Sequence, residues 1–401
     1  MRFRTSFAAV LALAAALALA GCAKKPAAPQ AQQVQDEWGV ITIGPNDPIK
    51  LGVASALSGP VASLGVPIKD AALLAIQEKG TILGHKVEAN AQDDACAAEP
   101  SVNAARTLVA DKLVVGVVGS MCSSGTIPAS DVYAEAHLTM ISPSSTAPNV
   151  TSRGLENVFR TAWNDKMQGA AQAKFALETL KAKKAALIHD KSPYGQGLME
   201  AFKENFEKGG GQVVLFEAID VGQTDFSAVV SKIKPLAPDV IAFGGFIAEG
   251  ALLVKQIREA GIQAAFMGAD GIDDDKFVES AGGKAEGVYI SNGQALKGAT
   301  YEAFAQKWRQ RFNSEPGTFT PQAYDAAMIL LNAVEKVAVK NPDGSLSIGK
   351  KALRDAVRAT KMEGASGAIE FEANGDRKVA AEAVIKQVKN GKREVIATIA
   401  P

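Results

Sequence analysis

Histidine, cysteine and aromatic residues are scarce in this sequence, and its charges cancel. The three histidines, His85, His137 and His189, are widely separated, and no pair has the spacing of zinc ligands, so no zinc site is expected. Lys and Arg together number 43, and Asp and Glu together number 43. A net charge of zero gives no reason to expect nucleic acid or an anionic membrane surface as a partner. Nothing in the composition predicts a metal or a cofactor.

Motifs of the common enzyme classes are also missing. No Gly-x-Ser-x-Gly nucleophile elbow occurs. Residues 344–350 read Gly-x-x-x-x-Gly-Lys, a near match to a phosphate-binding loop, but Lys351 stands where Ser or Thr should hold Mg²⁺. The three aspartates at 273–275 lack calcium-loop spacing and indicate the start of a helix instead. Ser123 and Ser124 have no histidine placed beside them by any motif, so we do not expect an enzyme.

The N-terminal region predicts where the protein resides. Two arginines precede an apolar stretch over 7–20, which is too short to span a bilayer comfortably and is typical of a secretory signal peptide. The stretch ends in Leu-Ala-Gly-Cys22, which resembles the bacterial lipobox, in which the cysteine is acylated. We therefore predict a lipoprotein signal peptide over 1–22, with ordinary signal-peptidase cleavage as the alternative. Residues 23–48 begin with Ala, Pro and Gln and predict a flexible tether to a lipid anchor on Cys22.

Two cysteines remain if Cys22 carries lipid. An exported protein with exactly two thiols, here Cys96 and Cys122, invites a disulfide. Two unrelated buried thiols are the alternative.

Strand and helix patterns alternate through the rest of the chain. One series runs over 49–162 and a second begins at 163. Their β-α-β order implies parallel sheets with right-handed crossovers, and two series imply two doubly wound lobes of an α/β fold. The last third predicts helices over 301–312, 321–339 and 347–360 and strands over 368–371 and 379–388. These tail elements could cover either lobe.

Polar residues gather where the predicted strands end. The loops 119–126 and 142–146 of the first series are rich in Ser and Thr, whereas the loops 189–195, 243–246 and 268–271 of the second carry aromatics and one acid. The carboxyl ends of parallel strands meet at one sheet edge. Hydroxyls beside a helix N-terminus there offer a site for a carboxylate. Plain capping of helices by Ser and Thr is the alternative.

Taken as a collinear set, these loops resemble the leucine/isoleucine/valine-binding proteins of bacterial ABC importers. The resemblance covers about residues 48–390. It rests on the following motifs: Leu57-Ser58-Gly59-Pro60, Asp93-Asp94-Ala95-Cys96, Cys122-Ser123-Ser124, Pro128-Ala129-Ser130-Asp131, Ser145-Thr146-Ala147-Pro148, His189-Asp190-Lys191 with Tyr194-Gly195, and Phe266-Met267-Gly268.

The resemblance implies a type I periplasmic binding protein with its ligand in a cleft between two lobes joined by a three-strand hinge. The first lobe would comprise 49–162 with 294–374, and the second 163–293 with 375–401. A disulfide between the two cysteines of the first lobe, Cys96 and Cys122, is also implied.

The family's ligand-binding positions carry over residue by residue. By resemblance, Ser123 and Thr146 bind the ligand carboxylate, Ser144 contributes backbone, Tyr194 lines the cleft and Asp270 pairs with the ligand ammonium.

Three positions depart from the family pattern. Leu64 replaces a frequent aromatic, Phe246 replaces a Tyr, and Asp270 is shorter than the usual Glu. The headgroup site is thus preserved while the side-chain pocket is altered. Because Leu64 and Phe246 are apolar, a charged ligand side chain is disfavoured, and leucine, isoleucine or valine is expected. A larger apolar or aromatic amino acid is the alternative.

The resemblance implies a function outside the cytoplasm. A monomer in the periplasm or cell envelope, held to a membrane only by its lipid anchor, would capture the amino acid and pass it to the permease subunits of an ABC importer. A sensor module that reports an amino acid or amide to a membrane receptor is the alternative, because the same lobes serve both purposes.

Overall fold

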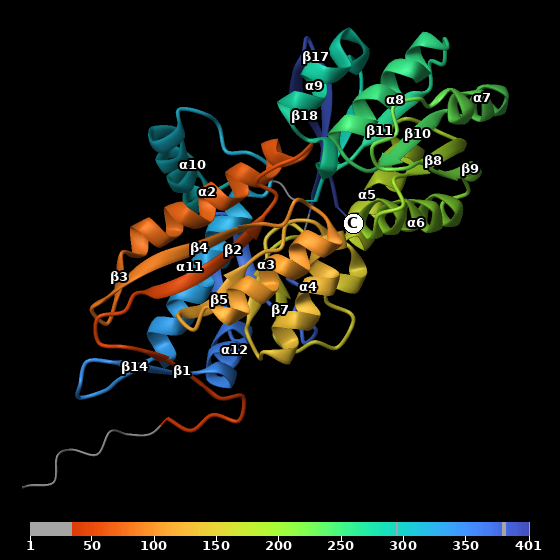
Figure 1. Ribbon diagram of the computed structural model, residues 1–401. Helices are drawn as coiled ribbons and strands as arrows, with labels where there is room; N and C mark the ends of the chain where they lie inside the picture. The colour runs from red at the N-terminus through yellow and green to blue at the C-terminus, as the bar shows by residue number, and fades with distance from the viewer. Residues whose placement is uncertain (1–33, 294–295, 379–381, 401) are drawn as a thin grey trace, which may run out of the picture.

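The computed structural model describes residues 34–293, 296–378 and 382–400, and it contains two separate α/β lobes, each built on its own sheet (Figure 1). The predicted signal peptide, with Cys22, lies outside these residues. Within the part of the chain that is described, no helix is both long and apolar enough to cross a bilayer.

The first lobe is built on a six-stranded sheet of order β3-β4-β2-β5-β6-β7. Its strands are β2 (Ile49–Ser55), β3 (Thr81–Ile82), β4 (His85–Asp93), β5 (Val114–Val118), β6 (Met140–Ser142) and β7 (Val158–Arg160). Its helices are α2 (Ala62–Lys79), α3 (Ala98–Ala110), α4 (Ser123–Glu135), α10 (Ala299–Phe312), α11 (Thr320–Val337) and α12 (Lys350–Arg358), with a short 3₁₀ turn, η1 (Pro148–Val150). All pairings except that of β3 are parallel.

Helices cover both faces of this sheet. Successive strand residues point to opposite faces, and Gly116 of β5 faces Leu330 of α11 while Val117 and Gly52 lie against Leu108 of α3. Every residue of β5 is buried. A continuous apolar run such as Val114–Val118 is what a strand covered on both faces requires.

The second lobe is built on a seven-stranded sheet of order β18-β17-β12-β11-β10-β8-β9. Its strands are β8 (Lys184–His189), β9 (Gln212–Ala218), β10 (Val240–Gly244), β11 (Ala265–Gly268), β12 (Tyr289–Asn292), β17 (Ala383–Lys389) and β18 (Lys392–Ile399). Its helices are α5 (Asp165–Glu178), α6 (Pro193–Lys208), α7 (Ser227–Leu236), α8 (Ile247–Glu259) and α9 (Asp275–Ala281), with two short 3₁₀ turns, η2 (Asp270–Ile272) and η3 (Gly282–Ala285). The five strands from β12 to β9 are parallel, and β17 and β18 extend the edge in antiparallel fashion.

The chain passes between the lobes at three places. The first follows β7, the second follows β12, and the third lies between β16 (Gly367–Glu370) and β17. The first and third crossings touch, because the backbone nitrogen of Arg160 donates to the carbonyl of Gly375 at 3.1 Å. Three such connections form a hinge about which two rigid lobes can move.

The structure corrects the expected tether. Residues Val40–Ile43 form β1, which pairs antiparallel with β14 (Leu346–Gly349) in a small sheet completed by β13 (Val339–Lys340). The carboxylate of Asp36 accepts hydrogen bonds from the backbone nitrogens of Lys351 (3.0 Å) and Ala352 (2.9 Å) at the start of α12. The second half of the 23–48 segment is therefore part of the first lobe and not a flexible tether.

Two tail elements also differ from expectation. Residues 347–349 belong to β14 and not to a helix, because they pair with β1, some 300 positions earlier in the chain. The strands expected over 368–371 and 379–388 have different main partners: β16 pairs with β15 (Lys361–Gly364), whereas β17 pairs with β12 and β18. The turn after β16 is closed by an isolated antiparallel bridge between Phe371 and Arg377. β14 and β17 each have a partner distant in sequence, β1 and β12 respectively, so local pattern alone could not place these two strands.

Candidate ligand-binding site

One pocket lies between the lobes at the carboxyl ends of their strands. Its lining contains all seven residues expected at the site, namely Leu64, Ser123, Ser144, Thr146, Tyr194, Phe246 and Asp270, together with Met121, Cys122, Gly271 and Phe319. The cavity has a volume of about 20 Å³, which is room for roughly one water molecule. The lobes are thus closed around the pocket, and they must separate for a ligand of several atoms to enter.

The first lobe contributes a helix N-terminus and hydroxyl groups. Helix α4 begins at Ser123, directly after the loop that follows β5, so its free N–H groups and positive dipole end lie at the pocket. Ser123 is 2 % exposed, and its hydroxyl oxygen accepts from the backbone nitrogen of Ala147 at 3.2 Å. The hydroxyl of Ser144 donates to the carbonyl of Met121 at 2.8 Å. This half of the pocket suits an anion such as a carboxylate.

The second lobe contributes two aromatic rings and a carboxylate. Tyr194 lies in the first turn of α6, and its hydroxyl accepts from the backbone nitrogen of Gly271 at 3.0 Å. Its ring packs on Phe246, with ring centres 5.4 Å apart. The aromatic pair is thereby fixed beside Asp270.

The carboxyl group of Asp270 is buried and incompletely bonded. It is 4 % exposed, and its Oδ1 atom has no hydrogen-bond partner among the described residues. Burial raises the pKa of Asp270 to about 7, although the Gln168 amide and the Tyr194 hydroxyl act in the opposite direction. The neighbouring Asp273 already takes up the ammonium of Lys386 (2.6 Å) and the guanidinium of Arg393. Asp270 is therefore a site for a cation that the described residues do not supply.

A second buried carboxyl group, Asp165, was not anticipated from the sequence. It is the first residue of α5, it is 0 % exposed, and neither carboxylate oxygen has a hydrogen-bond partner in the described part of the chain. Burial and then the charge of Asp270 raise its pKa well above the usual range. Its backbone nitrogen donates to the carbonyl of Thr146 at 2.9 Å, which places it behind the pocket wall. In the sequence it looks like any acid at a helix start, so only the fold could single it out.

Phe319 lines the pocket from a segment that the sequence analysis did not connect with the site. It adopts a left-handed backbone conformation (φ 67°) just before α11, and its ring stacks on Trp163 at 4.7 Å. Trp163 belongs to the first crossing between the lobes. Phe319 therefore joins the wall of the pocket to the hinge.

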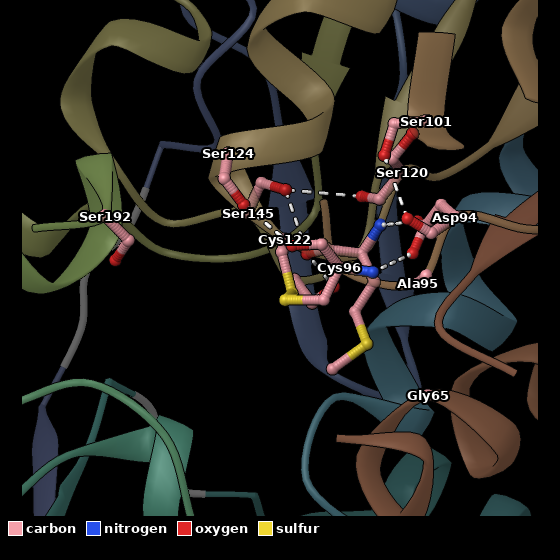
Figure 2. The surroundings of a disulfide bond; sticks show 12 residues. Gly65, Asp94, Ala95, Cys96, Ser101, Ser120, Cys122, Ser124, Ser145 and Ser192 are labelled. Atoms are coloured by element: carbon pink, nitrogen blue, oxygen red, sulfur yellow. Dashed lines mark hydrogen bonds between the residues drawn. A yellow bond between two sulfur atoms is a disulfide. The ribbon is translucent and has the colours of Figure 1, made fainter. Parts of the chain in front are cut away.

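The expected disulfide is present. Cys96 and Cys122 are bonded, with their Cα atoms 5.1 Å apart (Figure 2). Cys122 lines the pocket and immediately precedes Ser123, the first residue of α4. The disulfide therefore fixes one end of the anion-binding half.

Replacing both Cys96 and Cys122 by Ser should lower the free energy of unfolding by about 3 kcal/mol, because the unfolded chain regains the freedom of the closed loop. Chemical denaturation of wild type and variant measures the difference. A reducing agent should destabilise the wild type and leave the variant unchanged. Equal denaturation midpoints for the two proteins would contradict the prediction.

Comparison with known proteins gives one consistent family. The family described as Periplasmic binding protein matches residues 48–393. A leucine-, isoleucine-, valine-, threonine- and alanine-binding protein of Pseudomonas aeruginosa is 36 % identical over 341 residues, which cover 83 % of this chain and 88 % of the relative. A leucine-specific-binding protein of Salmonella typhimurium is 32 % identical over 83 % of this chain and 89 % of its own.

Solved structures agree. The leucine binding protein LivK from Thermotoga maritima superposes with a TM-score of 0.81 at 30 % identity, covering 88 % of this chain and 99 % of its own. The branched-chain amino acid binding protein LivJ from Streptococcus pneumoniae, in complex with isoleucine, gives a TM-score of 0.79 at 29 % identity, covering 88 % of this chain and all of its own.

Proposed function

The chain belongs to the periplasmic binding protein family, and from that premise we propose that it captures leucine, isoleucine or valine between its lobes and delivers it to an ABC importer. The family consists of solute-binding proteins and not of enzymes. Relatives at 32–36 % identity that bear the names of leucine- and branched-chain-amino-acid-binding proteins support the ligand class.

The observation that carries the proposal is the division of charge across the pocket. The first lobe presents a helix N-terminus with Ser123 and Thr146, which suits a carboxylate, and the second lobe presents the buried carboxyl of Asp270, which suits an ammonium group. An α-amino acid carries both groups on one carbon. One zwitterion can therefore satisfy both lobes at once, and this favours the closed arrangement.

The rest of the lining supports an aliphatic side chain. Leu64, Met121, Phe246 and Phe319 are apolar and surround the charged headgroup site. A charged ligand side chain buried among them would lack a partner, at a cost that a hydrocarbon chain avoids. We propose that the two lobes, 49–162 with 294–374 and 163–293 with 375–401, separate and close as bodies around this ligand.

Calorimetric titration of the purified protein with each of the twenty amino acids tests the proposal. We expect the strongest binding for leucine, isoleucine or valine and no measurable binding for lysine or aspartate. Preference for a charged amino acid, or binding of none of the twenty, would overturn it.

The affinity for leucine should fall as the pH drops below about 7. Asp270 has a pKa raised to about 7 by burial, and a bound ammonium favours its ionised form. Below this pKa the carboxyl must lose a proton before it can pair, so affinity should fall about tenfold per pH unit between pH 7 and pH 5. Titrations at pH 5, 6, 7 and 8 measure the profile. A flat profile would show that Asp270 does not meet the ammonium.

We also propose that Cys22 carries the lipid that holds this protein to a membrane on the periplasmic side, where it acts as a monomer. The Leu-Ala-Gly-Cys22 ending supports this. Cys22→Ser should leave a soluble protein or an unprocessed precursor, as membrane fractionation and mass spectrometry would detect. Recovery of mature, acylated protein from the variant would refute the anchor.

A further inference from the structure

A buried carboxylate outside the pocket is hydrogen-bonded to the backbone of Met121 in the pocket wall. Asp94 follows β4 and is fully buried. Its Oδ2 atom accepts from the backbone nitrogen of Met121 at 2.8 Å, and its Oδ1 atom accepts from the backbone nitrogen of Cys96 at 2.9 Å. In Figure 2, dashed lines join two backbone nitrogens to the carboxylate of Asp94, beside the Cys96–Cys122 disulfide. Asp94 therefore bonds Cys96, one end of the disulfide, and Met121, the residue directly before Cys122 at the other end.

Met121 is also hydrogen-bonded through its backbone carbonyl. Its carbonyl accepts from the hydroxyls of Ser144 at 2.8 Å and Ser145 at 2.9 Å. Ser144 and Met121 line the pocket, and Thr146 follows directly in the chain. A path thus runs from Asp94 through the backbone of Met121, from its nitrogen across its Cα atom to its carbonyl, to the loop that carries the carboxylate-binding hydroxyls.

The turn at Ala95 and Cys96, to which Asp94 is hydrogen-bonded, has an unfavourable backbone conformation. Ala95 and Cys96 are consecutive non-glycine residues with φ of 46° and 57°. Side chains disfavour this left-handed region, so the turn persists only where surrounding bonds fix it. The hydroxyl of Ser124 adds one such bond to the carbonyl of Cys96 at 3.0 Å. Without the Asp94 carboxylate, the backbone nitrogens of Cys96 and Met121 would each lose a hydrogen bond, and neither the turn nor the backbone of Met121 would be fixed.

We propose that Asp94 is a positioning residue for amino-acid binding. It orients the backbone of Met121 and, through Met121, the groups of the first lobe that bind the ligand carboxylate. The inference rests on the proposed function, because it assigns Asp94 a role in the affinity of that same site. Asp94 does not touch the ligand in this arrangement. It acts through Met121 and through the start of α4.

Leucine binding by Asp94→Asn tests the proposal. The amide keeps the size of the side chain but places an N–H₂ group against one of the two backbone donors, so we expect leucine affinity to fall about tenfold. The matched control is Asp93→Asn in the same turn. Asp93 is exposed and bonds the backbone nitrogens of Leu57 and Ala95 but not Met121. The control should change affinity less than about twofold.

A double-mutant cycle distinguishes a positioning effect through Met121 from a general loss of stability of the first lobe. Ser145→Ala removes a donor to the Met121 carbonyl, so its effect on leucine affinity should depend on whether Asp94 is intact, by about threefold or more. Additive effects of Asp94→Asn and Ser145→Ala would contradict a shared route through Met121.

A spectroscopic measurement on the wild type remains decisive if Asp94→Asn does not fold. In protein labelled with ¹⁵N-methionine, the Met121 amide signal should shift on saturation with leucine. It should also titrate with Asp94, whose pKa burial raises to about 6 and which faces Asp93 and the buried hydroxyl of Tyr133. An unmoved Met121 signal would overturn the inference. If the wild type binds no amino acid at all, the proposed function itself has failed; if it binds leucine and Asp94→Asn binds equally well, only this inference has failed.

Discussion

Asp270→Asn should weaken leucine binding by roughly two to four decades, which corresponds to about 3–5 kcal/mol for breaking a buried ion pair. The substitution keeps the size of the side chain and removes its charge. The ligand ammonium would then be enclosed beside a neutral amide, in a pocket that closure has emptied of water. Calorimetric titration of the folded variant with leucine measures the loss, and unchanged affinity would sink the assignment.

A stability measurement separates this role from a structural one. The pKa of Asp270 is raised to about 7 in the folded protein, against 3.8 for an ordinary aspartate, so the folded state holds more protons than the unfolded state between about pH 4 and pH 7. Stability without ligand should therefore fall as the pH rises through this window. Asp270→Asn removes that loss, so the variant should unfold at pH 8 no more easily than the wild type while binding leucine far less tightly.

The control for Asp270→Asn is the same loss of one negative charge at a carboxylate on the surface, away from the pocket. Asp274 is unsuitable, because it is half-buried and caps α9 by accepting from the backbone nitrogen of Lys276. Glu279 is the better choice, because its side chain is 63 % exposed and meets only Lys276 in an exposed pair. Glu279→Gln should change leucine affinity less than about twofold.

Asp376→Ala should lower the free energy of unfolding by about 3–5 kcal/mol, the cost of leaving a buried charge without its partner. The partner is Arg160, whose side chain is fully buried and whose Nε atom lies 2.6 Å from Oδ1 of Asp376. Arg160 also donates to the carbonyls of Ser145 (3.1 Å) and Ala147 (2.9 Å). The pair thus links the first and third crossings of the hinge to the pocket loop.

Chemical denaturation monitored by tryptophan fluorescence measures this loss. An exposed ion pair in the same lobe supplies the comparison: Asp131, with a side chain 62 % exposed, pairs with Arg153 at 2.9 Å. Asp131→Ala should cost less than about 1 kcal/mol. If both variants lose the same stability, the burial of Arg160 is not what makes Asp376 important.

The sequence predicted best the strands and loops whose positions follow from the regular alternation of strands and helices along the chain. The second alternating series forms one sheet, and its central strands β8 and β10 are apolar runs because a buried parallel strand needs an uninterrupted apolar run. The seven pocket residues lie in loops that follow strands or in the first turn of the next helix, and these segments meet at the sheet edges as parallel topology requires. Their individual roles came from family resemblance and not from spacing.

The features that the sequence did not reveal depend on contacts between distant segments. Asp165 matters because Asp270, about a hundred residues later, lies close enough to raise its pKa. Phe319 reaches the pocket because it stacks on Trp163 in the hinge. Asp94 acts on Met121 only because the loops after β4 and β5 meet. No local pattern encodes such pairs, since each residue alone looks like a helix start, a loop aromatic or a turn acid.

The pairing of β1 with β14 also constrains the order in which the molecule can be assembled. Val40 is opposite Gly349, and the apolar face of β5 at Gly116 is covered by Leu330, so the first lobe is completed by residues made after most of the second. The second lobe in turn waits for β17 and β18 at the end of the chain. A chain emerging from its N-terminus must therefore carry an unfinished first lobe, with exposed apolar surface, until nearly all of it is available. Truncation after residue 293 should leave an aggregation-prone fragment and not an isolated lobe.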